Sequence, residues 1–287
     1  MATSYRAENR IAHHVTSAPM TLVECLTGHF KLKPEEASQL IELGAIYQNK
    51  YRIFQNIQMK KGSYVRIHLK PKRFPVDGID WKKCIVANES DFIVVNKPYD
   101  IPVHATLDNH EENVLTQMRK ALGGNLYVTQ RLDVPVGGLL VFAKTKEFQT
   151  KFNRLLSDKA VSKFYSVLTE KEPQQGYHLH YMAPSERSPK EMSFEKKEKW
   201  LPCELKIENS NPVVLGKHSF VESRIQLLTG RTHQIRAQFK LLGCPLINDA
   251  QYGSPYRLPD SQSIGLFCSE VGWADKRYEL KPDYQIS

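Results

Sequence analysis

The sequence lacks the features of several protein classes. Its 5 cysteines are scattered and form no CxxC pair, so neither a disulfide framework nor a zinc site is expected. No apolar run is long enough to span a bilayer, and the start has no apolar core of a signal peptide. Gly123-Gly124 and Gly137-Gly138 are isolated pairs and not a dinucleotide-binding GxGxxG. We therefore expect a cytoplasmic protein without metal or cofactor.

Acidic residues are outnumbered in this chain of 287 residues. It carries 31 Asp+Glu against 40 Lys+Arg, which leaves a net charge of +9 and a pI near 9.2. The hydrophobic share of 41% and the charged share of 25% are those of an ordinary globular protein. The positive excess favours a polyanionic partner. The sequence shows no basic amphipathic helix of the kind that would bind a membrane surface. RNA or DNA is the expected partner.

Residues 1–70 predict a small α/β module. Weak signals in the first twenty residues or so indicate an arm, in which His13 and His14 are expected to be solvated. Apolar spacing then predicts a helix from Thr21 and a second from Pro34, since proline is favourable at a first helical position. Short strands are expected at 45–50 and 65–69.

This order of elements resembles the alpha-L RNA-binding motif, which is often fused to RNA-modifying enzymes. Residues 40–50 match part of its signature "LIxxGxVxVNGK", whereas Glu35 and Glu36 stand where the motif usually has basic residues. A structural module without RNA contacts is the alternative. Residues 71–84 are expected to form a basic, proline-punctuated linker, and residues 85–287 a second domain.

Residues 85–287 mix strand and helix patterns without a strict βαβ rhythm. Strands are expected at 92–95, 126–128, 139–143, 163–168 and 221–228, and helices at 114–122, 148–156 and 235–242. This favours an α+β fold with a mixed, mainly antiparallel sheet and flanking helices. The densely charged run 193–199 is expected to be a solvated loop or hairpin. His178 and His180 alternate on a probable strand but lack a third metal ligand.

Two segments carry candidate chemistry. Asp133 lies between Arg131 and a Pro/Gly turn that leads into a strand. A carboxylate in a partly buried bend must be hydrogen-bonded or paired, so Asp133 is either a structural turn acid or a reactive group. Further along, His233, Arg236 and Lys240 lie three and four residues apart beside an apolar helical face. This second set is either a solvated basic face or part of a site.

Taken together, these segments resemble the RluA-type pseudouridine synthase family from about residue 85 to 275. Its motifs "DDxIVVNKP", "HRLDxxTSGLLLxAK", "KxYxAxV", "TGRTHQIRxH" and "LGxPIxGDxxYG" are matched in family order by residues 91–98, 131–144, 163–165, 229–236 and 242–253. The chain departs from the family at Gln130, where His is usual, and at Val136-Gly137, where Thr-Ser is usual. Because Asp133 and its arginine are kept, activity is expected.

The resemblance implies an isomerase that converts uridine to pseudouridine in structured ribosomal or transfer RNA. It gives Asp133 the role of nucleophile, and Tyr165 that of stacking on the target base and assisting proton transfer. Arg236 is the expected ion-pair partner of Asp133, with Arg231 as the alternate. RNA contacts are expected from Arg131, Arg231, His233, Lys163 and Lys97. No cofactor or metal is implied, and a monomer is expected.

Other functions stay open at this point. The replacements at Gln130, Val136 and Gly137 motivate a non-catalytic RNA-binding or RNA-chaperone protein on the same scaffold. Tyr165 could be a core tyrosine of its strand. A carboxylate glycoside hydrolase is a more distant alternative, since no second acid can be assigned to the protonation step.

Overall fold

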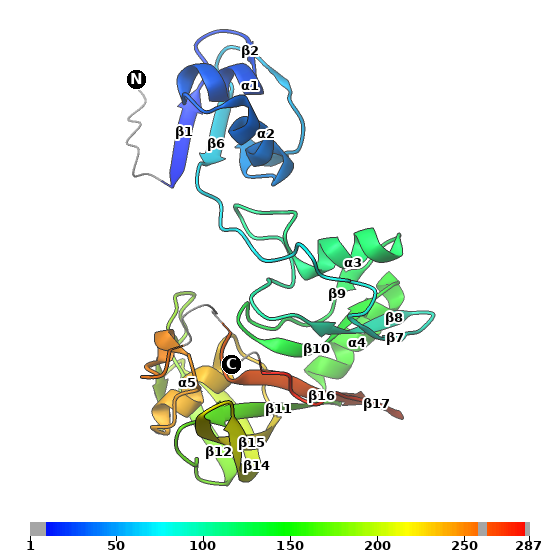
Figure 1. The fold of residues 1–287 in the computed structure, drawn as a ribbon, viewed down its shortest axis with the longest axis vertical. Helices are drawn as coiled ribbons and strands as arrows, with labels where there is room; N and C mark the ends of the chain where they lie inside the picture. The colour runs from blue at the N-terminus through cyan, green and yellow to red at the C-terminus, as the bar shows by residue number, and fades with distance from the viewer. Residues whose placement is uncertain (1–9, 258–262, 285–287) are drawn as a thin grey trace. The chain divides into compact units, whose positions relative to one another are not determined.

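The structure is a computed structural model that describes residues 10–257 and 263–284 (Figure 1). The chain forms two compact units. Unit 1 comprises Met1–Ile79 and His104–Lys120, and unit 2 comprises Asp80–Val103 and Ala121–Ser287. Each unit has its own sheet, so the two are described separately.

Unit 1 is a small sheet packed on helices. Its elements are β1 (Ile11–Val15), β2 (Met20–Thr21), α1 (Leu22–Glu24), a π-helical turn η1 (Cys25–His29), α2 (Pro34–Glu42), β3 (Ile46–Gln48), β4 (Tyr51–Ile53), β5 (Gln58–Met59) and β6 (Tyr64–His68). The antiparallel order β1-β6-β3-β4 makes a four-stranded sheet, and β2 pairs with β5. Leu26, Leu40 and Val65 belong to one buried cluster, so the helices cover the inner face of the sheet.

Residues 11–15 form a strand, which corrects this part of the expected arm, whereas residues 1–9 of that arm lie outside the described residues. β1 pairs antiparallel with β6, and its side chains alternate between exposed and buried. His14 is only 8% exposed and lies against His29 and Phe30, so the expectation that it is solvated is wrong. Burial, with His29 nearby, lowers the pKa of His14. The predicted helix at Pro34 and the predicted strands near 46–48 and 64–68 are confirmed.

Unit 2 is built on an eleven-stranded sheet. The core strand order is β13-β12-β14-β15-β11-β16-β10-β8-β7, with β17 added to β16 and β9 to β10. The strands are β7 (Ile85–Asn88), β8 (Phe92–Lys97), β9 (Tyr127–Val128), β10 (Gly137–Ala143), β11 (Val161–Thr169), β12 (Gly176–Met182), β13 (Met192–Ser193), β14 (Leu201–Leu215), β15 (His218–Leu227), β16 (Leu266–Trp273) and β17 (Lys276–Glu279). β10 pairs parallel with β16, whereas the neighbouring pairs are antiparallel. The expected α+β fold with a mainly antiparallel sheet is confirmed.

Short helices accompany this sheet. They are α4 (Lys146–Ser157), α5 (Gln234–Leu241) and the 3-10 turn η2 (Ala250–Tyr252), while α3 (Val114–Leu122) crosses the boundary between the units. The charged run 193–199 begins with Ser193 at the end of β13 and continues as a loop, in line with the expected loop or hairpin, but the fifteen-residue β14 that follows was not predicted. Its first half alternates, with Cys203, Leu205 and Ile207 buried and Glu204, Lys206 and Glu208 more exposed.

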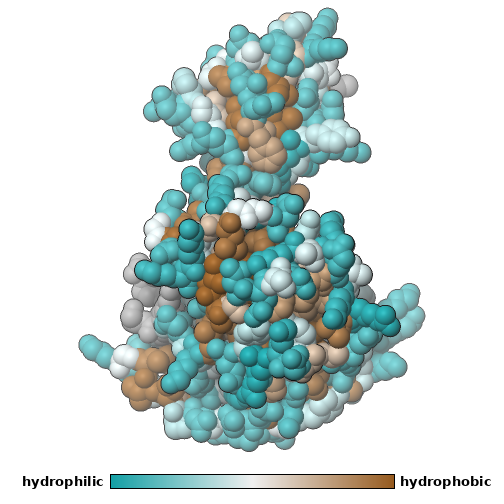
Figure 2. Space-filling model, turned by 90° about the vertical axis from the view of Figure 1, so that its right-hand side faces the viewer, coloured by the Kyte–Doolittle hydropathy of each residue, from teal (hydrophilic) through white to brown (hydrophobic). Residues whose placement is uncertain are grey.

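The surface has no single dominant apolar region on the side drawn in Figure 2. Brown hydrophobic residues form separate patches among teal hydrophilic ones. Within the described ranges 10–257 and 263–284, no helix is long and apolar enough to cross a membrane.

Candidate active site

Strand β16 aligns the two strands that carry the site. Cys268 on β16 is the register partner of Gly138 on β10 and of Tyr165 on β11. The turn before β10, which holds Asp133, therefore comes within electrostatic range of Tyr165. Gly138 has φ +109°, and a Cβ there would lie 2.3 Å from the carbonyl oxygen of Cys268. Only glycine permits this approach of the two backbones.

The Asp133 carboxylate is paired with one arginine. Arg236 Nη1 donates to Asp133 Oδ2 at 3.3 Å, and the Asp133 side chain keeps 22% exposure. Arg236 is 4% exposed as a residue and comes from the buried face of α5. The expected ion pair with Arg236 is therefore present, and the alternative of a solvated basic face does not hold for this residue.

Arg236 is itself held by a second carboxylate. Its Nε and Nη2 donate to Asp249 Oδ2 and Oδ1 at 2.7 and 2.9 Å, a bidentate contact with a side chain that is 1% exposed. Its Nη2 also donates to Gln251 Oε1 at 3.0 Å. Burial alone lowers the pKa of Arg236, but the contacts with Asp249 and Asp133 outweigh it and raise that pKa. A permanently charged group thus faces Asp133.

His233 touches Asp133 on another side. Its Nε2 lies 3.7 Å from Asp133 Oδ2, and its Nδ1 lies 3.0 Å from the hydroxyl of Tyr252. The main-chain N–H of Lys190 donates to that hydroxyl at 2.8 Å, which leaves the hydroxyl proton free to bond Nδ1. Burial lowers the pKa of His233, against the opposing effect of Asp133. If the Tyr252 hydroxyl donates to Nδ1, neutral His233 carries its proton on Nε2, toward the carboxylate.

Lys97 supports the Asp133 turn from beneath. Its Nζ donates to the carbonyl oxygens of Pro98, Val134 and Val136 at 2.9, 3.1 and 2.7 Å. The residue is 1% exposed, and burial lowers its pKa to about 7 against the effects of Asp100 and Asp133. A lysine enclosed in this way does not reach a phosphate. The prediction that Lys97 contacts RNA is wrong, because its donors are spent on the turn.

Tyr165 lies in the floor of the site. It is 6% exposed, and burial, with Cys268 and Asp133 close by, raises its pKa well above the usual value. The phenol is therefore protonated at neutral pH and can donate a proton or a hydrogen bond but is a poor base. The two expectations for Tyr165, a core tyrosine of its strand and a residue of the site, are compatible, because the side chain is largely buried and still lies near Asp133.

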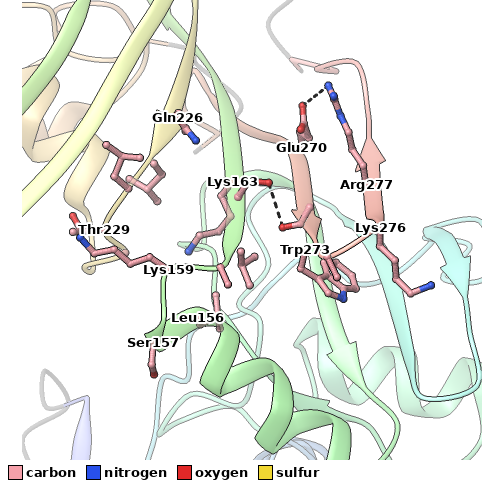
Figure 3. Close-up of a pocket in the computed structure, with 18 of the residues that line it drawn as sticks. Leu156, Ser157, Lys159, Lys163, Gln226, Thr229, Glu270, Trp273, Lys276 and Arg277 are labelled. Carbon is pink, nitrogen blue, oxygen red and sulfur yellow. Dashed lines mark hydrogen bonds and ion pairs between the residues drawn. The ribbon is translucent and has the colours of Figure 1, made fainter.

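Lys163 reaches into a cavity of about 890 Å³ beside the site (Figure 3). The cavity is lined by β11, β15 and β16 residues and by 229–231, but not by Asp133. Two other lining cations are paired: Lys159 with Glu204 at 3.2 Å and Arg277 with Glu270 at 3.0 Å. In the described part of the chain, Lys163 has no carboxylate within 4.0 Å. Burial lowers its pKa.

Two other predicted RNA contacts, Arg231 and Arg131, form no ion pair with Asp133 among the described residues. Arg231 is half-buried, and its Nε donates to the Pro202 carbonyl at 2.9 Å, so it does not replace Arg236 as the ion-pair partner. Arg131 is exposed. Gln130 is half-buried, and among the described residues its Nε2 has no hydrogen-bond partner.

The sequence did not assign roles to several residues that build the site. Asp249 and Tyr252 lie inside a matched motif, which was the available signal, whereas Gln251 had none. The place of Gly137 is explained by Tyr99, because a Cβ at position 137 would lie 2.7 Å from the Tyr99 ring. Among the residues that the structure describes, no cluster of three His, Cys, Asp or Glu side chains could hold a metal ion.

Known proteins are similar to this chain over the region that contains Asp133, Tyr165 and Arg236. A family model described as RNA pseudouridylate synthase matches residues 91–241, more than half of the chain. "RNA pseudouridine synthase 6, chloroplastic" from Oryza sativa subsp. japonica is 34% identical over 217 residues, 69% of this chain and 46% of the relative. The protein of the same name from Arabidopsis thaliana is 34% identical over 226 residues, 71% of this chain and 48% of the relative. This chain thus spans about half the length of these two curated relatives.

The fold has a solved counterpart. A structure titled "Human RNA Pseudouridylate Synthase Domain Containing 4" superposes with a TM-score of 0.57 at 21% identity, and the match covers 71% of this chain and 90% of that one. At this identity the likeness concerns the fold alone.

Proposed function

Because the chain belongs to the RNA pseudouridylate synthase family, we propose that it isomerises uridine to pseudouridine in structured RNA, with Asp133 as nucleophile. The observation that carries this proposal is the ion pair of Asp133 with Arg236, which Asp249 anchors in turn. Asp133 keeps 22% exposure, so a ribose can reach the carboxylate that pairs with the Arg236 guanidinium.

The proposed isomerisation requires few groups besides the side chains of this site. The N–C bond between ribose and uracil breaks, the base turns, and a C–C bond forms, while the proton lost from carbon is balanced by one gained on nitrogen. Asp133 would attack the ribose carbon and later leave it. The protonated Tyr165 and the Nε2–H of His233 are the donors beside it. No oxidant, metal or energy source is needed.

RNA access to the site demands that the uridine leave its stack. Flipping a base costs a few kcal/mol, and less in a loop than in a duplex. Arg131, exposed beside Asp133, is suited to filling the vacated stack or holding a phosphate, because its guanidinium is flat and always charged. Ribosomal or transfer RNA as substrate, the monomeric state and the cytoplasmic location stay predictions.

The test compares the chain with its Asp133→Asn variant on cellular RNA from cells that lack the gene. Pseudouridines are mapped at single-nucleotide resolution after incubation. We expect new sites with the unmodified chain and none with the variant. Identical maps would exclude catalysis by Asp133 and would favour the non-catalytic RNA-binding protein. Lys151→Met, at an exposed position of α4, serves as a control.

A further inference from the structure

Charge is distributed unevenly over unit 1. The segments that carry its strands, residues 10–21 and 43–76, contain nine Lys or Arg and no Asp or Glu. The helical segment between them, residues 22–42, contains four Glu and two Lys. Glu35 and Glu36 are exposed in the first turn of α2, where acids also suit the helix dipole. The helix side therefore repels a polyanion and the strand side attracts one.

The outer face of the sheet carries a row of side chains across all four strands. His13 on β1 is the register partner of Arg66 on β6, Arg66 that of Tyr47 on β3, and Tyr47 that of Arg52 on β4. The Arg66 guanidinium lies 4.4 Å from the centre of the Tyr47 ring, and that of Arg52 lies 4.9 Å from it. This row is on the face opposite to the helices.

One half of this outer face is already covered. The segment 106–108 of unit 1 lies over β3 and β4, where the Tyr47 hydroxyl donates to the Leu107 carbonyl at 2.7 Å. Arg52 donates to the carbonyls of Gly44 and Thr106 at 2.8 and 2.6 Å. These contacts use the donors of Arg52, so it is not available to another partner.

The other half, formed by β1 and β6, is open. Ile11, Val15 and Tyr64 are 42%, 57% and 38% exposed on it, and the His13 ring stacks on Tyr64 with centroids 5.9 Å apart. Arg66 borders this half: the residue is half-buried with its guanidinium over the Tyr47 ring, and its buried Nε has no hydrogen-bond partner among the described residues. Flat rings and a guanidinium without a carboxylate are the groups on which bases stack.

Cations stand at both ends of the open half. Lys60 and Lys61 are exposed in the turn before β6, which is tied to β1 because Thr16 donates to the Lys60 carbonyl at 2.6 Å. Arg10 and Lys70 lie at the opposite end, where the Leu69 N–H donates to the Arg10 carbonyl at 2.9 Å. A five-residue strand is roughly 13–16 Å long. The stacking side chains thus lie between two positive ends that can hold successive phosphates.

We propose that the β1–β6 half of this sheet binds single-stranded RNA, with bases on Tyr64 and His13 and phosphates on Lys60, Lys61, Arg66 and the Arg10–Lys70 end. Helix α2 faces away from the strand. The occupant is single-stranded because paired bases do not present their faces to aromatic side chains. The proposal rests on the proposed function only in taking RNA as the polyanion, since it concerns binding in unit 1 and not chemistry at Asp133.

The test measures binding with the full chain carrying Asp133→Asn, so that no reaction occurs. Anisotropy of a labelled single-stranded twelve-nucleotide RNA is titrated at several KCl concentrations. Lys60→Gln/Lys61→Gln is compared with Lys31→Gln/Lys33→Gln, which removes the same charge from exposed positions on the helix side. We expect the first pair to weaken binding several-fold and to flatten the salt dependence by about one to two charges. The second pair should stay within about twofold.

Stacking is tested at one position. Tyr64→Ala should weaken single-strand binding about tenfold, whereas Tyr64→Phe, which keeps the ring and loses only the hydroxyl contact with His13 Nδ1 at 2.5 Å, should lose much less. A duplex of the same sequence should be indifferent to Tyr64→Ala. Thermal unfolding confirms that the variants are folded, which is expected because Tyr64 and the lysines are exposed.

Equal losses from the two lysine pairs, or no loss from Tyr64→Ala, would overturn the proposal. No change with any variant would instead assign the face to a protein partner. These outcomes are separate from the proposed function, because pseudouridine formation is measured with Asp133 intact. If the chain forms pseudouridine but all variants bind the oligonucleotide equally, the proposed function stands and the proposed RNA-binding surface is excluded.

Discussion

The ring of Tyr99 fills the space that a side chain at Gly137 would need. A Cβ atom built on Gly137 lies 2.7 Å from Tyr99 Cε2. The glycine that departs from the family motif is therefore matched by a bulky neighbour, and the two positions form one packing unit. The Asp133 turn beside this contact is closed by the Val136 N–H, which donates to the Asp133 carbonyl at 3.1 Å.

This pairing makes a double-mutant prediction. Gly137→Ser alone should destabilise the chain by about 1–3 kcal/mol, because the added atoms overpack a buried site. Tyr99→Leu in the same chain should recover part of that loss, which gives a favourable coupling energy in urea unfolding. Gly28→Ser is the control, since nothing lies within 4 Å of a Cβ at Gly28. Strictly additive effects of the two changes would contradict the pairing.

Lys97 makes a second prediction. Lys97→Met keeps the length of the side chain but leaves three carbonyl oxygens around the Asp133 turn without their donor. Each unsatisfied buried acceptor costs about 1–3 kcal/mol, so we expect a loss of roughly 3 kcal/mol or more in urea unfolding and a large loss of pseudouridine formation. Lys151→Met, at an exposed position of α4, should change neither. A stable but RNA-binding-deficient Lys97→Met chain would restore the RNA role.

His233 predicts a pH dependence of stability. Burial lowers its pKa below the ordinary 6.5, so the folded chain binds fewer protons than the unfolded chain once the pH falls below about 6.5. The neutral imidazole contributes stability that is complete above that pH and is lost as the pH falls toward the lowered pKa. His233→Gln keeps an N–H donor but cannot titrate. From pH 7.5 to 5.5 the unmodified chain should lose more unfolding free energy than this variant, and equal losses would refute the assignment.

The sequence predicted much of the reaction centre but little of its support. Asp133, Tyr165 and Arg236 come from separate motifs, and matching those motifs brought them together before any geometry was known. Lys97 was assigned wrongly because the local sequence around a lysine next to a turn is the same whether its ammonium group binds a phosphate or donates to three carbonyl oxygens. Only burial separates the two cases, and burial is set by strands that are distant in sequence.

The fold shows the same division. Helices with regular apolar spacing, such as α2 and α4, were located from their own residues. β1 was not predicted because a short segment with an outward-facing histidine between apolar residues resembles a loop in the sequence. Its pairing with β6 makes it a strand. His233 is held by Tyr252, which lies 19 residues away in the sequence. Tyr252 in turn is held by Lys190, which lies 62 residues from it. Pairwise spacing along the chain carries no information on such contacts.

The shared register at Cys268 sets an order of assembly. β10 and β11 are not direct neighbours in the sheet, since β16, more than a hundred residues later, lies between them. A nascent chain that ends after residue 165 therefore contains Asp133 and Tyr165 but lacks both Arg236 and the strand that aligns them. The proposed reaction centre would be completed late in synthesis, once Leu266–Trp273 has been made.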